Sequence, residues 1–427
     1  MAWDFSTEPE FEAKLEWMRE FVREEVIPLE TVELDWETFG RITAPLKEQV
    51  KERGLWASHL PPELGGGGFG QVKLGLMHEI LGQCRFAPTV FGNTAPDSGN
   101  AELLAIGGSP EQKERWMHPL LRGELRSAFS MTEPGAGADP TMLSTRAVRD
   151  GDEYVINGHK WFSSNASIAD FLIVMAVTDP DVSPYQGSSM IIVPIDTPGV
   201  NVLRDIPVMD HPLSGGLDGG HAEVLYTDVR VPAENLVGKP GDGFRLAQQR
   251  LGPGRIHHAM RWLGQSKRAF DMLCERAVSR EAFGSTLGEK QMVQDWVATS
   301  AAEMQAARLL TLHAAWTMDQ VGASNARLEI GMIKYWGAKV LHDVIDRAIQ
   351  VHGSLGFSGD MPLEQMYRSA RAARIYDGPD EVHKSTVAKR ILRGYQPVEV
   401  PTEHVPTRKE AAQRRFADYL SAATANL

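Results

Sequence analysis

Apolar positions follow two different spacings along the chain, and the change between them divides the sequence into three parts. Near the start, Phe11, Leu15, Met18 and Val22 recur at helical spacing, which predicts an amphipathic first helix. Further helix-like segments lie at 45–56, 73–84 and 109–123. In the last of these, Ser109 precedes acidic and amide residues, as an N-cap does. Residues 1–125 are therefore predicted to form a helical domain.

Between residues 126 and 240 the spacing becomes that of β-strands. Segment 144–163 contains two turn dipeptides, Asp150-Gly151 and Asn157-Gly158, each flanked by β-forming residues. Such dipeptides predict hairpins. Further strand-like segments lie at 170–177, 188–195 and 221–232. We expect a small sheet or barrel domain here.

From Gly243 onward the helical spacing returns in three long segments. One face of the first carries only apolar side chains: Ile256, Met260, Leu263, Phe270, Leu273 and Ala277. The other two segments span 289–320 and 326–353. Long helices joined by short turns predict an antiparallel four-helix bundle over residues 241–395. The polar remainder, 396–427, is either a short terminal helix or a loose tail. The predicted fold class is α+β, with a β domain between two helical ones.

Composition and charge exclude several classes of function. The net charge of -12 argues against a nucleic-acid partner, because phosphate binding requires a clustered positive surface. Cys84 and Cys274 are the two cysteines, with no metal-ligand spacing, so neither a metal site nor a disulfide scaffold is expected. The Glu-rich start is not a signal peptide, and the longest apolar run, 171–177, is too short for a membrane span. We expect a cytoplasmic protein.

A glycine-rich segment matches a dinucleotide-binding pattern only formally. Gly65, Gly67 and Gly70 in "LGGGGFG" have the spacing G-x-G-x-x-G. That fingerprint requires a strand directly before it, whereas "HLPPE" with two prolines precedes it here. The pattern is therefore interpreted as a flexible loop.

Two segments near the β domain have the residues of a ligand site. In "FSMTEPGAGAD", Gly135 and Gly137 allow backbone N–H groups to approach a ligand, and Thr132 adds a hydroxyl. In "GHKWFSSNA", an aromatic ring at Phe162 and a hydroxyl at Ser164 lie on one side of a strand, as a flat cofactor requires. Taken alone, a tight loop and a core aromatic explain these segments equally well or better.

The stretch "RIYDGPDEVHKSTVAKRIL" predicts a helix that begins near Pro379. Asp377 and Gly378 precede this helix. Asp is among the commonest N-cap residues, so a capping role for Asp377 is favoured when the stretch is considered alone.

Considered together, four segments resemble the acyl-CoA dehydrogenase family. "MTEPGAGAD" is similar to its first signature, "NGHKWFSSNA" to the strand behind its flavin, "SREAFGSTLGEKQ" to its adenine-end segment, and residues 350–379 to its second signature. The resemblance covers about residues 5–395. "APDSGN", "QRLGPGRIHH", "DRAIQ" and "DGPDEVH" resemble especially the branch whose animal members are fused to a kinase-like domain.

The resemblance implies FAD as the cofactor. The implied FAD contacts are Met131, Thr132, Gly137, Phe162, Ser164, Arg280, Phe283, Gln291, Gln350 and Gly353. Phe162 stands where the family usually has Trp, and Ser164 where it usually has Thr. Arg280 and Gln291 match the positions that hold the diphosphate and adenosine end, while Gln350 and Gly353 match positions that reach FAD across a subunit contact.

The resemblance also assigns the base to Asp377, where the family usually has Glu. The base takes the proton at C2 of the acyl chain while hydride leaves C3, and its backbone N–H polarises the thioester carbonyl. Gly254 occupies the alternative base position of some members and has no side chain. An apolar pocket closed by acyl-CoA is expected to raise the pKa of Asp377. Arg255 either binds substrate or keeps Asp377 ionised. Ala138 and Gly378 match further substrate-side positions.

The implied function is FAD-dependent α,β-dehydrogenation of an acyl-CoA, as in fatty acid β-oxidation, with electrons passed to an electron-transfer flavoprotein. The implied assembly is a homodimer or a dimer of dimers. Two alternatives remain open at this point. One is a flavin oxidase of a small carbon acid, similar to nitroalkane oxidase, which also uses Asp as its base. The other is a catalytically silent flavoprotein.

Overall fold

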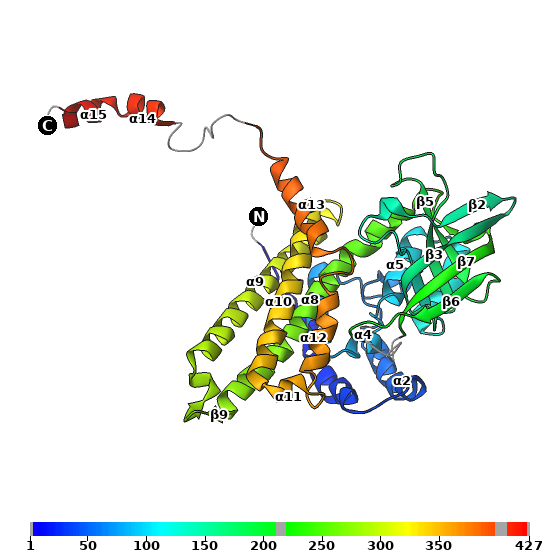
Figure 1. The fold of residues 1–427 in the computed structure, drawn as a ribbon, viewed down its shortest axis with the longest axis horizontal. Helices are drawn as coiled ribbons and strands as arrows, with labels where there is room; N and C mark the ends of the chain where they lie inside the picture. The colour runs from blue at the N-terminus through cyan, green and yellow to red at the C-terminus, as the bar shows by residue number, and fades with distance from the viewer. Residues whose placement is uncertain (1–2, 211–218, 398–407, 425–427) are drawn as a thin grey trace. The chain divides into compact units, whose positions relative to one another are not determined.

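The computed structural model describes residues 3–210, 219–397 and 408–424 (Figure 1). Along the chain, helices are followed by a β-sheet and then by long helices, which confirms the predicted fold class. The described chain forms two compact units, Met1–Lys384 and Ser385–Leu427. The sheet, the long helices and all the predicted site residues belong to the first unit.

The N-terminal part consists of short and medium helices around an apolar core. Its α-helices are α1 (Pro9–Phe21), α2 (Trp36–Glu52), α3 (Gln71–Leu81), α4 (Ala87–Val90), α5 (Asp97–Gly107), α6 (Pro110–Gln112) and α7 (His118–Arg122). Phe11, Leu15 and Met18 are buried in this core, as their helical spacing predicts. At α6, Ser109 and Gln112 form a reciprocal capping box, so the predicted N-cap is confirmed.

The glycine-rich loop leads into α3 but does not form a nucleotide site. A short 3₁₀ turn, Pro62–Leu64, precedes it instead of a strand. The first N–H groups of α3, on Gln71 and Val72, donate to the carboxylate of Asp319 at 2.7 and 3.0 Å. Asp319 belongs to α9 (Gln291–Val321), so a side chain already occupies the two N–H groups that a phosphate would need first at this helix N-terminus.

The β domain is one eight-stranded sheet. Its strands are β1 (Ser127–Ser130), β2 (Arg146–Asp150), β3 (Glu153–Ser164), β4 (Phe171–Val177), β5 (Ser188–Pro194), β6 (Val200–Asp205), β7 (His221–Pro232) and β8 (Leu236–Val237). The spatial order is β6-β7-β3-β1-β4-β5-β8, and β2 pairs with both β3 and β4. β4 and β5, which lie inside the sheet, are buried along nearly their whole length, in agreement with the apolar residues of β4 and the middle of β5.

One of the two predicted hairpins forms, and the other prediction was wrong. Asp150-Gly151 lies at the turn between β2 and β3, with Asp150 paired to Glu153. Asn157-Gly158 lies inside β3, where the register with β7 shifts. A Cβ on Gly158 would lie 2.2 Å from Thr145 Oγ1. This glycine therefore permits a bulge and a close approach between segments, not a turn.

Three long helices dominate the C-terminal part: α8 (Gly243–Ser279), α9 (Gln291–Val321) and α10 (Arg327–His352). α10 packs against both α8 and α9, and α3 of the N-terminal part packs on the same bundle. The shorter α11 (Ser354–Phe357) and α12 (Leu363–Ala372) follow, and α12 packs against α10. Between α8 and α9 a small hairpin forms from β9 (Glu281–Ala282) and β10 (Ser285–Thr286).

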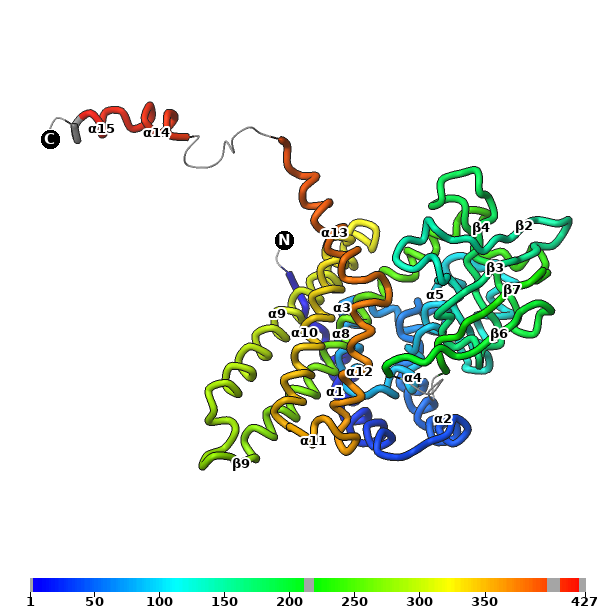
Figure 2. Tube along the Cα trace, viewed as in Figure 1, coloured from blue at the N-terminus to red at the C-terminus, as the bar shows by residue number. Residues whose placement is uncertain are grey.

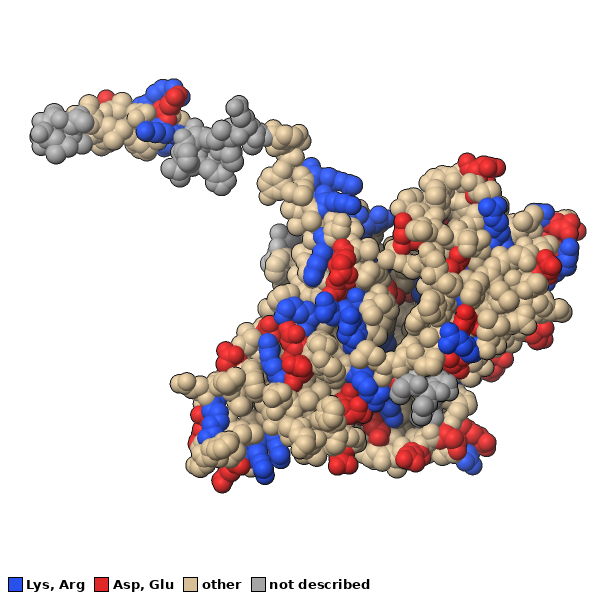
Figure 3. Space-filling model, viewed as in Figure 1, with Lys and Arg blue, Asp and Glu red and all other residues tan. Residues whose placement is uncertain are grey.

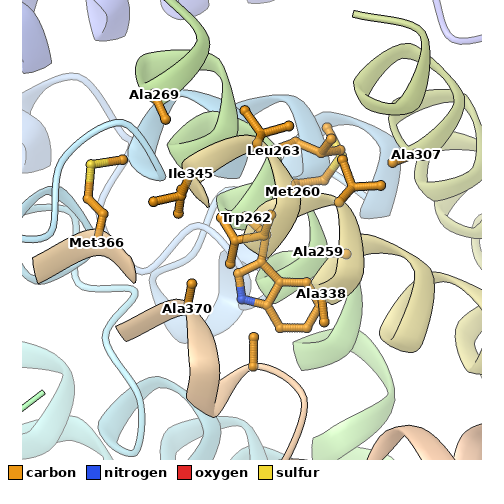
Figure 4. Close-up of a cluster of buried hydrophobic side chains, with 14 of the residues drawn as sticks. Ala259, Met260, Trp262, Leu263, Ala269, Ala307, Ala338, Ile345, Met366 and Ala370 are labelled. Carbon is orange, nitrogen blue, oxygen red and sulfur yellow. The ribbon is translucent and has the colours of Figure 1, made fainter. Parts of the chain in front are cut away.

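The core of the bundle contains the apolar face predicted for α8. Figure 4 shows Met260, Trp262 and Leu263 of α8 beside alanines of the neighbouring helices. The indole Nε1 of Trp262 donates to Tyr376 Oη at 2.9 Å, so the core is joined to the turn that follows α12.

The chain ends in α13 (Asp380–Leu392), α14 (Lys409–Arg415) and α15 (Ala417–Thr424) (Figure 2). Part of the predicted polar tail, at 398–407 and 425–427, lies outside the described residues. None of the helices in the described ranges has the length and apolar character needed to cross a membrane.

Candidate active site

Asp377 lies in the turn between α12 and α13, in a backbone conformation that few residues adopt. Its φ is 55°, and that of the following Gly378 is 95°. A Cβ at Gly378 would lie 2.8 Å from His383 Nε2, so glycine is required both for the left-handed backbone and for the close approach. The two-residue turn therefore has a fixed shape before α13 begins at Asp380.

The backbone of this turn is held by side chains from three helices. The carbonyl oxygen of Asp377 accepts from Arg255 Nε and Nη2 at 3.2 and 3.1 Å, and from His383 Nε2 at 3.1 Å. Lys334 Nζ on α10 donates to the carbonyl oxygens of Ala373 and Gly378 at 2.6 and 3.2 Å. Arg255 thus contacts the Asp377 backbone, and its position favours a role in holding this residue.

The carboxylate of Asp377 contacts an imidazole instead of capping a helix. Its Oδ2 lies 3.4 Å from His258 Nε2, and the two side chains are 21% and 22% exposed. Among the described residues, no backbone N–H donates a hydrogen bond to this carboxylate. The capping role that the local sequence favours is therefore not what the structure shows.

Without bound acyl-CoA, the pKa of Asp377 lies below the ordinary value for Asp. The rise expected for a pocket closed by acyl-CoA stays a prediction. Burial alone raises this pKa, but the groups around the carboxylate outweigh burial: His258, Arg255, Arg250 and Lys334. Burial lowers the pKa of His258 itself to about 3, so this ring is neutral at pH 7 and acts as a dipole there. The arginines and Lys334 supply the positive charge that keeps Asp377 ionised.

Four of the predicted cofactor residues lie together where the chain leaves β1 beside the last residues of β3, here called the β1–β3 end: Met131, Thr132, Phe162 and Ser164. The carbonyl oxygens of Met131 and Thr132 accept from Lys160 Nζ and Trp161 N, each at 2.8 Å. Ser164 Oγ lies 2.8 Å from His221 Nδ1. The strand pairing that puts Phe129 opposite Ser164 joins these two segments.

Phe162 in this group presents its ring to the exterior. It is 42% exposed and has a φ of 56°. Nearby, Gly137 and Ala138 are exposed, and a Cβ on Gly137 would meet no atom within 4 Å. A bulky residue with positive φ is uncommon, and such strain collects at functional sites.

The remaining predicted cofactor residues lie at the far end of the bundle. Arg280 ends α8, Phe283 is fully exposed in the β9–β10 hairpin with a φ of 52°, and Gln291 begins α9. Gln350 and Gly353 lie at the end of α10. On α8, Arg280 follows the Asp377-contacting Arg255 by 25 residues, or about 37 Å at 1.5 Å per residue. Within one chain, Arg280 is therefore far from Asp377.

α12 connects the bundle to the β domain close to the Asp377 turn. Arg368 donates to the carbonyl oxygens of Met209 and Asp210, both at 2.9 Å. On α8, the Arg250 guanidinium lies 4.1 Å from the ring centroid of Phe129 on the sheet. The surface is hollowed between the bundle and the β domain (Figure 3).

Sequence reasoning did not assign roles to Arg250, His258 or Lys334. A signal for two of them was present, because Arg250, Arg255, His258 and Arg261 recur every three to five residues on α8. Such spacing predicts a polar stripe on one helix face. Lys334 has no comparable signal, since it reaches the turn from a different helix.

Comparison with known proteins matches three consecutive domain families: "Acyl-CoA dehydrogenase, N-terminal domain" at 8–124, "middle domain" at 128–214 and "C-terminal domain" at 241–392. The chain is 46% identical over 352 residues to rat "Acyl-CoA dehydrogenase family member 11", covering 82% of this chain but 44% of that protein. It is 45% identical over 376 residues to the probable acyl-CoA dehydrogenase FadE2 of Mycobacterium tuberculosis, covering 84% and 90%.

Solved structures agree with these matches. A putative acyl-CoA dehydrogenase from Mycobacterium abscessus superposes with a TM-score of 0.85 at 40% identity, covering 92% of this chain and 100% of that one. A glutaryl-coenzyme A dehydrogenase in complex with glutaryl-CoA gives 0.81 at 29%, covering 92% and 98%. PigA with FAD and proline gives 0.79 at 25%, covering 92% and 100%. The glutaryl-coenzyme A dehydrogenase structure contains glutaryl-CoA and the PigA structure contains FAD. The family matches and these neighbours indicate FAD as the cofactor of this chain. The chain belongs to the acyl-CoA dehydrogenase family.

Proposed function

We propose that this chain is an FAD-dependent acyl-CoA dehydrogenase that converts an acyl-CoA to its trans-2-enoyl-CoA and passes the electrons to an electron-transfer flavoprotein. The observation that carries the proposal is the Asp377 turn. Its carboxylate is partly exposed, fixed in position and surrounded by charges that lower its pKa. A carboxylate that is ionised at pH 7 carries no proton of its own and is able to accept one.

The residues at the β1–β3 end support FAD binding. An exposed aromatic ring at Phe162 provides a face for a flat ring system. Beside it, the indole Nε1 of Trp161 is buried without a hydrogen-bond partner in the described chain. A buried donor that lacks a protein partner is costly, so a ligand acceptor at this position would satisfy it. Thr132 and Ser164 add hydroxyl groups to the same region.

In the proposed reaction the protein handles the proton and the thioester. FAD, when bound, supplies the acceptor for the hydride that leaves C3. The Asp377 carboxylate accepts the proton from C2, and the electron pair left on C2 forms the new double bond with C3. Among the described residues the backbone N–H of Asp377 donates to no protein acceptor, which leaves it available to the thioester carbonyl.

The separation of the two predicted cofactor groups supports a homo-oligomer. Arg280 and Gln291 lie at the opposite end of α8 from the Asp377 turn, about 37 Å away along the helix. We propose that a second copy of the chain contributes these residues to one FAD, within a dimer or a dimer of dimers. Sedimentation analysis of the FAD-loaded protein tests this, and a fully loaded monomer would contradict it.

Replacement of the base tests the proposed reaction. Asp377→Asn is expected to keep the fold and FAD but to slow flavin reduction by an acyl-CoA about 10³-fold or more, because an amide does not accept the C2 proton. Asp377→Glu restores the usual family residue and should retain part of the activity. Glu381→Gln is the matched control, since Glu381 is exposed in the first turn of α13. Stopped-flow reduction of Asp377→Asn at the wild-type rate would end the assignment.

Substrate panels separate this function from the two alternatives. Anaerobic titration of the flavoprotein with acyl-CoAs should bleach the flavin, whereas nitroalkanes should not. Bleaching by nitroalkanes alone would indicate a carbon-acid oxidase, and no bleaching by either class would indicate a silent flavoprotein. The nature of the acyl chain then follows from the rates within the panel.

A further inference from the structure

His258 is placed between a guanidinium and the Asp377 carboxylate. Arg261 Nη2 lies 3.2 Å from His258 Nδ1, and His258 Nε2 lies 3.4 Å from Asp377 Oδ2. Arg261 is itself fixed, because its Nη1 donates to the carbonyl oxygen of Asn93 at 3.0 Å. The three side chains form a line from the N-terminal helical domain to the predicted base.

The chemistry of Arg261 determines where the imidazole proton lies. A guanidinium donates hydrogen bonds and has no acceptor, so His258 Nδ1 must accept and be unprotonated. In a neutral imidazole the other nitrogen then carries the proton. The pKa of His258 is lowered to about 3 by burial and by Arg261, so the ring is neutral at pH 7. The Nε2–H group therefore faces the carboxylate.

We propose that His258 is a positioning residue for Asp377, whose Nε2–H, fixed in its tautomer by Arg261, orients the carboxylate toward the substrate. This inference rests on the proposed role of Asp377 as the base. In this structure the two atoms are in contact at 3.4 Å without hydrogen-bond geometry, and catalytic contacts of this kind commonly tighten into hydrogen bonds when substrate binds.

A positioning residue compensates for the short reach of the Asp377 side chain. Asp carries its carboxylate on one methylene fewer than Glu, so its reach depends on the turn and on what holds its oxygens. The turn is fixed through the carbonyl of Asp377, by Arg255 and His383. His258 contacts the carboxylate itself. Small misplacement of a base strongly slows proton transfer, so this contact is expected to matter for rate.

The charged environment of Asp377 sets the background for any pH effect. The titratable and charged groups that act on it or share its site are Arg250, Arg255, His258 and Arg261 from α8, Lys334 from α10, Tyr376 of the same turn, and Asp380 and His383 from α13. The pKa of His383 is lowered to about 4 by burial, so it is also neutral at pH 7. With the cations unchanged, removal of His258 should raise the pKa of Asp377, because the ionised form loses the Nε2–H dipole beside it.

Two substitutions separate donation from packing. His258→Leu removes the donor but fills the space, whereas His258→Gln returns an N–H near the position of Nε2. His257→Leu is the matched control: His257 is the adjacent residue on α8, is equally neutral, and stacks on His78 instead of contacting Asp377. It alters the helix without altering the carboxylate contact.

The first measurement needs no substrate. Infrared titration of the FAD-loaded protein with ¹³C-labelled Asp, taking the band lost in Asp377→Asn, reports the pKa of this carboxyl. We expect His258→Leu to raise it by about one unit, while His258→Gln and His257→Leu remain near the wild type. An unchanged pKa in His258→Leu, or equal shifts in the Leu and Gln variants, would overturn the proposal.

The second measurement is the pH profile of flavin reduction by an acyl-CoA. His258→Leu should slow reduction about 10- to 100-fold at pH 7 and move the acidic limb of the profile to higher pH, and His258→Gln should restore most of both. A wild-type protein that no acyl-CoA reduces would contradict the proposed function, while the infrared titration would still decide whether His258 acts on Asp377.

Discussion

Among the described residues two lysines are fully buried, and their partners differ in a way that separates a structural ion pair from a functional charge. Lys160 in β3 contacts the Glu133 carboxylate at 2.9 Å. Lys334 in α10 donates to two backbone carbonyls of the Asp377 turn. Burial lowers the pKa of both lysines to about 8. The charge of Lys160 is neutralised by the adjacent Glu133 carboxylate. The charge of Lys334 has no adjacent carboxylate partner within the described part of the chain and lowers the pKa of Asp377.

The two lysines differ because they connect different groups of the fold. Glu133 also accepts hydrogen bonds from Ser144 and Thr145, so the Lys160–Glu133 pair connects the loop after β1 to the start of β2. Such a pair fixes structure but leaves no net charge. A lysine bound to carbonyls fixes a turn equally well and keeps its charge available to the site.

Glu133→Gln should have the largest effect on stability, because it leaves the charge of Lys160 buried without a counter-ion. Breaking a buried pair on one side costs about 3–5 kcal/mol, measurable by urea unfolding. The double variant Glu133→Gln/Lys160→Met should recover most of this loss, since the pair is removed as a whole. A single-variant loss below about 1 kcal/mol would show that the pair behaves like one on the surface.

The same pair predicts how acid acts on the fold. Burial raises the pKa of Glu133, but Lys160 and the hydrogen bonds outweigh it and bring the pKa to about 2, against 4.5 for the free carboxyl. Its contribution to stability is therefore complete above pH 4.5 and is lost as the pH falls toward 2. Between pH 4.5 and 2, the free energy of unfolding should fall more steeply for the wild type than for Glu133→Gln. Parallel curves would contradict the assignment.

Lys334→Met should have an intermediate effect on stability and a distinct effect on the site. Two carbonyls lose their donor, which costs about 1–3 kcal/mol. The loss of a nearby positive charge should also raise the pKa of Asp377 and move the acidic limb of flavin reduction to higher pH. Glu133→Gln/Lys160→Met, which removes the other buried lysine together with its partner, is the control and should leave that limb in place. Equal pH profiles for both lysine variants would remove the distinction between the two charges.

Arg230→Met should have the smallest effect on stability, because it removes an exposed cation and not a buried one. Arg230 is half exposed and pairs with Asp150 at 2.9 Å and Glu153 at 3.0 Å, beside the β2–β3 turn. Exposed pairs contribute less than about 1 kcal/mol, so thermal unfolding should change little. A loss comparable to that of Glu133→Gln would show that burial is not what separates these pairs.

Much of the fold follows from local patterns in the chain. Helical spacing at Phe11, Leu15 and Met18 and on α8 gave buried faces, because a 3.6-residue period determines which side chains share a side. Asp150-Gly151 gave a turn for an equally local reason. Asn157-Gly158 did not, since the approach of Thr145 from another segment determines its conformation, and no local pattern contains that approach.

The amino-acid sequence by itself determined the order of helices and strands, the family motifs and the candidacy of Asp377. Only the tertiary structure decided the surroundings of Asp377. Lys334, His258 and Arg250 come from positions 43 to 127 residues earlier in the chain, and they meet the turn because α8 and α10 pack together. The direction of the pKa shift of Asp377 depends on these contacts, because burial raises the pKa and the neighbouring groups lower it. Their balance depends on distances that helix packing fixes.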